Sequence, residues 1–339
     1  LARYWADRYQ DPYMAALFES MRETAKPRPN ELDVFLTPYQ LPLPGDLSQL
    51  PQSRVFSDVG VVFMRSNMAK PEQSVFFEFR SSPYGSFGHG HNDQNAFNLS
   101  AFGRPLLIDS GYYDHYNSAH HRNWTQSTRA HNAVLVNGRG QAHNSTSHYG
   151  EIVAFSDSDT QTYIIGDASA SYPAGMLSLF DRHILWLKPD TFLIVDDLSA
   201  PQPSNFEFLL HSARPFGVVN NEVFVRNEPA SCRISFLRPA TGNFEIHNEF
   251  LPPVGLIRAG RNVKPNKQWH LSTKIEKQKN ARFITLIQVD LLSGGETYPD
   301  FEYKIDGDGV FVRLSDGREG QIRFRSRSRG QLSTCQQDP

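Results

Sequence analysis

Histidine and aspartate side chains gather in one short stretch of this chain. His91, Asp109 and His131 offer two imidazoles and one carboxylate, a set that suits a borderline-soft divalent metal such as zinc. His89 lies two residues before His91, so in an extended segment both histidines point to the same face. One histidine of this pair can then hold a metal while the other does chemistry beside it. The pattern predicts a reactive site next to a bound metal.

The distribution of histidines supports this interpretation. Eight of the chain's 12 histidines lie between positions 89 and 148. Histidine changes its protonation near neutral pH and is the commonest metal ligand, so such a cluster indicates acid–base chemistry or metal binding. The alternative interpretation is a surface loop that is rich in polar residues.

Length and composition indicate a globular protein. The 339 residues are enough for two domains or for one sizeable core. A formal net charge of -2, from 34 basic and 36 acidic residues, gives no general attraction to nucleic acid or to an anionic membrane. No run approaches the roughly 18 apolar residues of a membrane span. We therefore expect neither nucleic acid nor a membrane as a partner.

The N-terminal part differs from the rest of the chain. Apolar residues at broadly helical spacing predict a helix or two over residues 1–30, with Asp11 as N-cap and Pro12 in the first turn. Frequent prolines then predict an irregular linker over residues 31–54.

Short apolar runs bounded by turn residues dominate residues 55–339. Runs that predict strands occupy residues 59–64, 74–79, 133–136 and 192–195. Turn signals that predict reversals occur at residues 137–138, 188–190 and 306–309. The sequence therefore predicts a mainly β chain, an antiparallel β-sandwich of two packed sheets.

Three segments carry a family resemblance. Residues 87–95, 105–111 and 129–138 resemble, in this order, segments of the heparinase II/III-like polysaccharide lyases. Those enzymes join an N-terminal (α/α) toroid to a C-terminal antiparallel β-sandwich, and they cleave uronate-containing polysaccharides such as heparin, heparan sulfate or alginate. The resemblance implies that residues 1–30 are a helical remnant of the toroid and that residues 55–339 are the sandwich domain.

The resemblance also assigns roles. It implies that His91, Asp109 and His131 bind zinc and that His89 is the active-site histidine. Most of the toroid, which normally supplies a catalytic tyrosine and a group that binds the carboxylate, is missing upstream of Leu1, so the missing toroid is an expected partner. A periplasmic or secreted bacterial location is expected.

β-Elimination needs several positioned groups. A base removes the C5 proton of a uronate, charge builds on the adjacent carboxylate, and an acid protonates the O4 leaving oxygen. His89 is suited to neutralising the carboxylate or to accepting the proton, and we predict that Tyr116 reaches the sugar as proton donor or stacking wall. For Tyr112 and Tyr113, packing in the core with a hydrogen-bonded hydroxyl is as strong an alternative as a role in the site.

Further residues near the histidines are candidates for binding anionic sugar or for orienting the metal ligands. Arginine suits carboxylate and sulfate through its bidentate geometry. Asp93 and Asn95 are predicted to orient the imidazoles from outside the ligand set. The predicted substrate-binding residues are His120, His121, Arg122, Trp124 and Arg129.

The sequence leads to one favoured function and two alternatives. The favoured function is a lyase for uronate-containing polysaccharide, with heparin or heparan sulfate first and alginate next. Its zinc is expected to be structural rather than catalytic, because an elimination needs no activated water. The alternatives are a zinc-dependent hydrolase that leaves saturated ends, and a non-catalytic sugar-binding sandwich.

Overall fold

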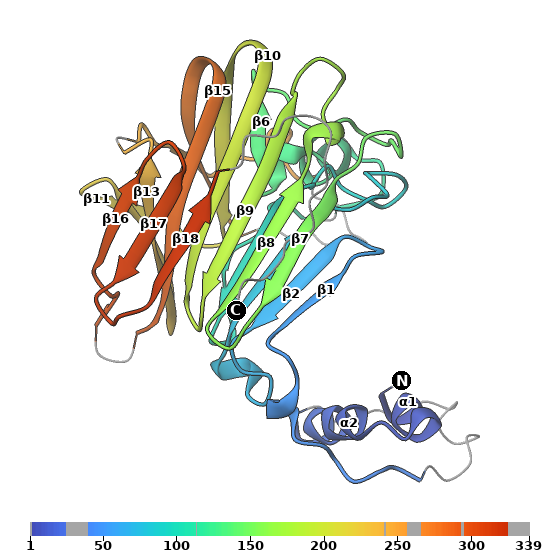
Figure 1. Ribbon diagram of the computed structural model, residues 1–339. Coiled ribbons are helices and arrows are strands. Elements are labelled where there is room, and N and C mark those ends of the chain that lie inside the picture. The colour runs from blue at the N-terminus through green and yellow to red at the C-terminus, as the bar shows by residue number, and fades with distance from the viewer. Residues whose placement is uncertain are drawn as a thin grey trace.

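The computed structural model describes residues 2–24, 40–112, 114–240, 242–255, 266–292 and 295–324. Two helices, α1 (Ala2–Tyr9) and α2 (Pro12–Thr24), form a separate pair at the N-terminal end of the chain (Figure 1). The side chain of Asp11 accepts hydrogen bonds from the backbone N–H groups of Tyr13 and Met14 at 2.8 and 3.0 Å. The predicted N-cap is therefore confirmed. The linker predicted over residues 31–54 falls partly outside the described residues.

A first sheet of five antiparallel strands follows the helical pair. Its order is β1-β2-β3-β4-β5, so each strand pairs with the next one along the chain. In β3 buried residues alternate with half-buried ones, because one face of the sheet covers the core while the other faces outward. The strands are β1 (Ser53–Phe56), β2 (Val61–Arg65), β3 (Val75–Arg80), β4 (Ala96–Ala101) and β5 (Arg104–Leu107).

A second sheet of ten strands packs against the first. Its main order is β11-β12-β13-β15-β10-β9-β8-β7. In addition, β14 pairs with β15 and β6 pairs with β10. The strands are β6 (Val134–Val136), β7 (Glu151–Asp157), β8 (Gln161–Asp167), β9 (Leu179–Leu187), β10 (Thr191–Ser212), β11 (Phe216–Val219), β12 (Glu222–Asn227), β13 (Ala230–Arg238), β14 (Glu245–His247) and β15 (Trp269–Leu291). Short helical turns are η1 (Leu47–Gln49), η2 (Pro71–Gln73), η3 (His121–Thr125), η4 (Thr128–Ala130) and η5 (Ser169–Ser171).

Aromatic side chains fill the space between these two sheets. The rings of Phe77 and Phe192 stack with centroids 4.6 Å apart, which joins β3 of the first sheet to β10 of the second. Phe77 also stacks on Phe97 at 5.2 Å, and Phe192 on Trp186 at 5.8 Å. The predicted antiparallel sandwich is confirmed.

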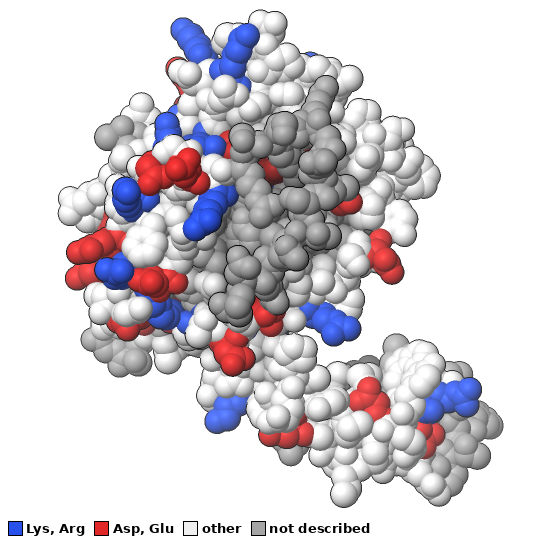
Figure 2. Space-filling model, viewed as in Figure 1, with Lys and Arg blue, Asp and Glu red and all other residues white. Residues whose placement is uncertain are grey.

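The C-terminal strands add a layer that the sequence did not predict. β16 (Phe301–Ile305), β17 (Gly309–Leu314) and β18 (Glu319–Arg323) form a third sheet. Its apolar residues pack on the outer face of the second sheet, in a cluster that includes Leu185 and Leu193 (Figure 1). The face seen in Figure 2 carries acidic and basic side chains interspersed. Among the described residues no helix is long and apolar enough to cross a membrane.

One buried ion pair links the second sheet to the loops of the first. The side chain of Arg182 on β9 is 0% exposed and binds both carboxylate oxygens of Asp196 on β10, at 2.6 and 2.7 Å. Its remaining nitrogen, Nη1, donates to the backbone carbonyls of Asn95 at 2.5 Å and Asn132 at 2.7 Å. The guanidinium therefore ties two loop segments to the sheet beneath them.

We expect Arg182→Met to lower the free energy of unfolding by about 3–5 kcal/mol, because it leaves the Asp196 carboxylate buried without its partner. Urea denaturation followed by circular dichroism measures the change. The matched control is Arg226→Met, since Arg226 makes a similar two-pronged pair with Glu296 but its side chain is 55% exposed. That control is expected to cost at most about 1 kcal/mol. Equal losses in the two variants would contradict the prediction.

Candidate functional site

The histidine-bearing loop lies between β3 and β4 and is fixed by backbone contacts. The Asn92 N–H donates to the carbonyl of Gln126 at 2.9 Å, and the hydroxyl of Thr128 donates to the Asn92 carbonyl at 2.9 Å. Gly88 has a φ of 68°, a left-handed conformation that glycine adopts without strain. These contacts hold the loop against the segment that carries η3 and η4 and so bring His91 toward His131.

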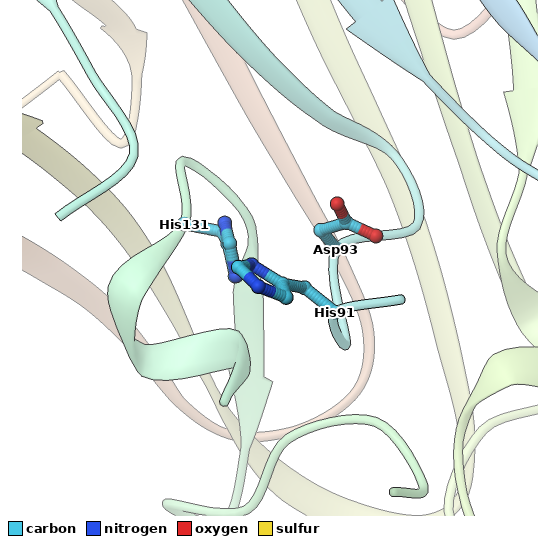
Figure 3. Close-up of side chains that lie close together, drawn as sticks. All are labelled: His91, Asp93 and His131. Atoms are coloured by element: carbon cyan, nitrogen blue, oxygen red, sulfur yellow. The ribbon is translucent and has the colours of Figure 1, made fainter. Parts of the chain in front are cut away.

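The imidazoles of His91 and His131 lie against each other, with ring centroids 5.2 Å apart, and Asp93 lies beside them (Figure 3). One potential ligand atom from each lies within 4.8 Å of the others. Nδ1 of His131 lies 2.9 Å from Oδ1 of Asp109, while Nε2 of His131 is buried without a hydrogen-bond partner among the described residues. A buried ring nitrogen without a partner, facing a second imidazole and a carboxylate, fits a metal such as zinc.

The ionisation of these groups follows from their surroundings. Burial, together with the nearby charge of His131, lowers the pKa of His91 to about 4. Burial opposes ionisation of Asp109, but the charge and hydrogen bond of His131 outweigh it and hold the pKa of Asp109 below its usual value. Burial raises the pKa of Asp93 despite the neighbouring His131 and Arg80. The pair of Asp109 and His131 is therefore the firmest charge interaction of the cluster.

The predicted ligand set is His91, Asp109 and His131, and the structure brings all three together with Asp93. It places Asp93 in the compact group and Asp109 on the other ring nitrogen of His131. A carboxylate on the far nitrogen orients an imidazole that binds metal through the near one. In this arrangement Asp93 occupies the position of a third ligand, and Asp109 occupies that of the orienting carboxylate.

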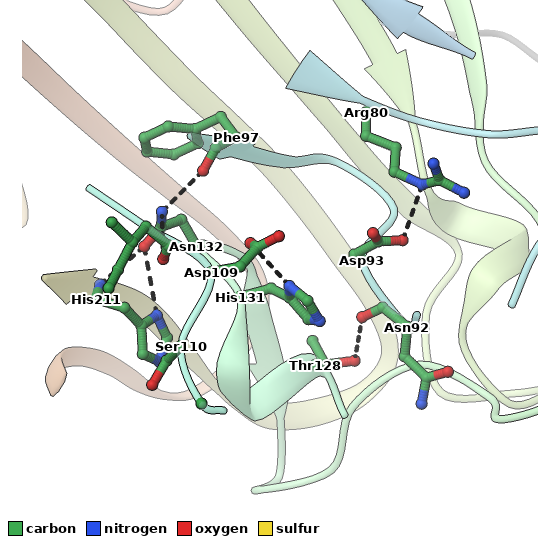
Figure 4. A network of polar contacts seen from close by, with 12 residues as sticks. Arg80, Asn92, Asp93, Phe97, Asp109, Ser110, Thr128, His131, Asn132 and His211 are labelled. Atoms are coloured by element: carbon green, nitrogen blue, oxygen red, sulfur yellow. Dashed lines mark hydrogen bonds and ion pairs between the residues drawn. The ribbon is translucent and has the colours of Figure 1, made fainter. Parts of the chain in front are cut away.

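Asn132, next to His131, anchors the site to three strands or strand ends (Figure 4). Its amide donates to the carbonyls of Phe97 at 2.8 Å and Ile108 at 3.3 Å, and its side-chain oxygen accepts from the backbone N–H of His211 at 2.8 Å. Asn132 is completely buried. This single amide fixes the chain on both sides of Asp109 and His131.

An aromatic group lies beside the metal-type cluster. The rings of His89 and Tyr116 have centroids 5.7 Å apart, and those of Tyr116 and His121 are 5.3 Å apart. Tyr116 is 50% exposed, so its hydroxyl is accessible to a ligand. The backbone N–H of Asn117 donates to Nδ1 of His121 at 3.2 Å, so in the neutral ring the proton sits on Nε2. The structure thus brings the two predicted catalytic residues together.

Comparison with known proteins identifies the fold. Residues 48–336 match the family described as "Heparinase II/III-like, C-terminal". The chain belongs to the heparinase II/III-like family. None of the curated proteins compared with this sequence matches it.

Solved structures agree with the assignment to the heparinase II/III-like family. Heparan sulfate lyase HepC from Pedobacter heparinus has a TM-score of 0.68 at 16% identity, over 95% of this chain and 47% of its own. The heparinase III-BT4657 gene product with methylated lysines has a TM-score of 0.68 at 15% identity, over 96% of this chain and 46% of its own. Another heparinase III structure has a TM-score of 0.61 at 14% identity, over 85% of this chain and 44% of its own. These likenesses show the fold, and the chain spans about half the length of the structures it matches.

Two residues that are predicted to bind substrate are buried beside the site. His120 is 1% exposed; its Nδ1 lies 2.8 Å from the carbonyl of Pro252, and its Nε2 accepts from the Tyr112 N–H at 3.3 Å. Trp124 is 4% exposed, and its indole N–H donates to the hydroxyl of Ser110 at 3.3 Å. Their polar atoms are already bonded within the protein, so the predicted contact of these two residues with sugar would require them to give up these bonds.

The other predicted residues have varied surroundings. Asn95 donates to the carbonyls of Gly166 and Phe180 on the second sheet, so it does not orient the imidazoles as predicted. Tyr112 packs edge-on against Phe250 at 6.0 Å, whereas Tyr113 lies outside the described residues. Arg122 and Arg129 are exposed, and a guanidinium nitrogen of Arg129 donates to the carbonyl of Gly138 at 2.8 Å. Of the two arginines, Arg122 has the less constrained position for an anionic ligand.

Sequence reasoning missed the residues that hold the cluster's periphery. Arg80 on β3 pairs with Asp93 at 3.1 Å. Gln141 and Gln94 exchange hydrogen bonds at 2.7 and 2.9 Å, which joins the segment after β6 to the histidine-bearing loop. The period-two alternation of β3 predicts that Arg80 faces outward, but it does not indicate which carboxylate it meets.

Two buried histidines behind the site generate a pH prediction. Burial lowers the pKa of His211 to about 3 and that of His270 to about 2. Below the unfolded-state pKa of about 6.5 only the unfolded chain takes up these protons, so stability falls as the pH falls. We expect each histidine to contribute a loss of about 1.4 kcal/mol per pH unit below about pH 6.5.

His270→Phe is expected to reduce the pH dependence of the free energy of unfolding by the contribution of one histidine, whatever the absolute stability of the variant. Urea unfolding at several pH values, in the presence of a chelator, measures the slope. His247→Phe is the matched control, because His247 is exposed and stands opposite His270 on β14. A slope that is identical in His270→Phe and the unsubstituted chain would refute the prediction.

Proposed function

We propose that this chain is the sandwich part of a polysaccharide lyase that cleaves uronate-containing glycan by β-elimination. The observation that carries the proposal is the position of His89 beside Tyr116, at 5.7 Å between ring centroids, next to the His91–His131 cluster. Membership of the heparinase II/III-like family supports the same reaction class. Two of the similar structures are those of heparan sulfate lyase HepC and a mutant of it, so heparan sulfate and heparin lead among substrates and alginate follows.

The residues suit the proton movements of an elimination. As the C5 proton leaves, negative charge spreads onto the uronate carboxylate, which an imidazolium or imidazole N–H at His89 stabilises. In this proposal the hydroxyl of Tyr116, a residue that is 50% exposed, donates a proton to the leaving O4 oxygen. In this proposal His121, whose ring lies 5.3 Å from that of Tyr116, helps to hold the tyrosine in position. Substrate and activity of the whole protein remain part of this proposal, because the chain spans about half of the structures it matches.

The lyase hypothesis is tested by incubating the protein with heparin, heparan sulfate, chondroitin or alginate and measuring the ultraviolet absorbance of unsaturated uronate ends. We expect absorbance to rise with heparan sulfate or heparin, and His89→Ala to reduce the rate by about 10²–10⁴-fold, the range of general acid–base catalysis. His247→Ala is the matched control, since that exposed histidine lies on β14. The chain and a longer form that includes a preceding toroid are assayed in parallel. New reducing ends without unsaturation would favour the hydrolase instead, and silence of both forms would reject the lyase.

We further propose that the cluster binds one zinc ion in a structural role. His91 and His131 would hold it with one carboxylate, and the bound ion would pin the histidine-bearing loop to the segments of Asp109 and His131. The buried, unpartnered Nε2 of His131 supports this proposal.

His131→Ala is expected to reduce zinc content from about one ion per chain to a small fraction, because only one imidazole then remains beside the carboxylates. Metal analysis by mass spectrometry after dialysis measures this, and thermal unfolding with and without chelator tests the structural role. The pair Asp93→Asn and Asp109→Asn identifies the third ligand by which variant loses the ion. Full zinc content in His131→Ala, or a melting temperature of the unsubstituted chain that ignores the chelator, would count against the proposal.

A further inference from the structure

A pocket opens on the outer face of the first sheet, directly beside the candidate site. Its volume is about 250 Å³, and Phe76, Asn98, Ser100, Pro105 and Asp109 are among the residues that line it. Phe76, Ser100 and Pro105 stand in one cross-strand row of β3, β4 and β5. The side chain of Asp109 is 43% exposed, so the same carboxylate that contacts His131 also borders the pocket. The pocket is therefore continuous with the cluster.

The aromatic wall of this pocket is held in place from the opposite side. Phe63 on β2 stacks on Phe76 with ring centroids 5.9 Å apart and an interplanar angle of 18°. The guanidinium of Arg65, also on β2, lies 4.4 Å from the centre of the Phe76 ring. Since β2 and β4 flank β3 on opposite sides, these contacts brace the ring from one side while the pocket lies on the other. A braced ring binds a flat apolar surface without a large loss of side-chain entropy.

The polar edge of the pocket contains an unused acceptor. The Asn98 side chain hydrogen-bonds to Glu78 and to Asp109, where it lowers the pKa of each carboxyl group. Its side-chain oxygen Oδ1 is buried and has no hydrogen-bond partner among the described residues. A buried acceptor without a partner favours a ligand that brings an O–H or N–H donor.

We infer that this pocket is a subsite for an uncharged pyranose unit that adjoins the uronate, with Phe76 against its C–H face and Asn98 accepting from a hydroxyl or amide group. Among the described residues that line the pocket there is no lysine or arginine, so none of them offers a positive charge to a carboxylate or a sulfate. An apolar wall combined with one amide and one hydroxyl suits a neutral sugar ring, such as a hexosamine with its amino group acylated. The inference rests on the proposed function, which places the uronate at His89 and Tyr116.

The test measures binding apart from turnover. In the His89→Ala background, calorimetry gives the dissociation constant for a saturated tetrasaccharide of alternating uronate and N-acetylhexosamine. Phe76→Ala is expected to weaken binding about fivefold to tenfold, the size of one lost aromatic contact. Ser100→Phe, which fills the pocket, is expected to weaken it at least as much. Phe56→Ala is the matched control, because Phe56 is exposed on β1 of the same sheet, contacts Phe63, and does not line the pocket.

The outcomes separate this inference from the proposed function. Loss of affinity in Phe76→Ala and Ser100→Phe, with little change in Phe56→Ala, supports the subsite even if no unsaturated product ever forms. Equal affinity in all variants overturns it even if the protein is an active lyase. Absence of any measurable binding overturns it as well. Near-ultraviolet circular dichroism shows whether each variant keeps its packed core.

Discussion

The site depends on one buried guanidinium. Arg182 uses two of its nitrogens to neutralise Asp196 within the second sheet and gives the third to the carbonyls of Asn95 and Asn132. Asn95 ends the loop that carries His91, and Asn132 directly follows His131. A charge that is 0% exposed is costly to bury unless every donor is satisfied, so these carbonyls are required partners of the arginine. The same constraint that stabilises the sandwich thus sets the distance between the two imidazoles.

The positions of the reactive groups follow from this anchoring. The side chain of Asn132 connects the ends of β4 and β5 to β10, because it hydrogen-bonds to Phe97, Ile108 and His211. His131 and Asp109 therefore sit on backbone that is bonded on several sides. A preorganised pair of this kind has little freedom to relax when a ligand or a proton arrives, which suits both metal binding and electrostatic catalysis. Tyr116, at 50% exposed, is in contrast open to solvent and has room to meet a sugar.

Much of this arrangement is predictable from the sequence, and the failures have physical causes. Alternation and turn residues predict the strands because each strand buries one face, and the spacing of His91, Asp109 and His131 indicates a common site. Burial of a polar aromatic residue is not visible in a local pattern, which is why Trp124 was expected at the surface and lies in the interior. The role of Arg182 depends on carbonyls that lie 87 and 50 residues away in sequence, so only the folded chain reveals it. The third sheet was not predicted for a similar reason. The sequence of its strands does not indicate which face of another sheet they cover.

The charges around the cluster suit the cation that we propose. The carboxyl groups of Glu78, Asp93 and Asp109 lie near two basic groups, Arg80 and His131, and Asp109 raises the pKa of His131 against the effect of burial. Burial and the neighbouring carboxyl groups raise the pKa of Glu78 and of Asp93, so an added positive charge would favour the ionised form of each. In our proposal His91, His131 and one carboxylate would hold a divalent ion that supplies this charge, and the ion would fix the loop to the segments of Asp109 and His131. By offsetting the carboxylates it would also reduce the repulsion that an anionic sugar meets beside Asp109.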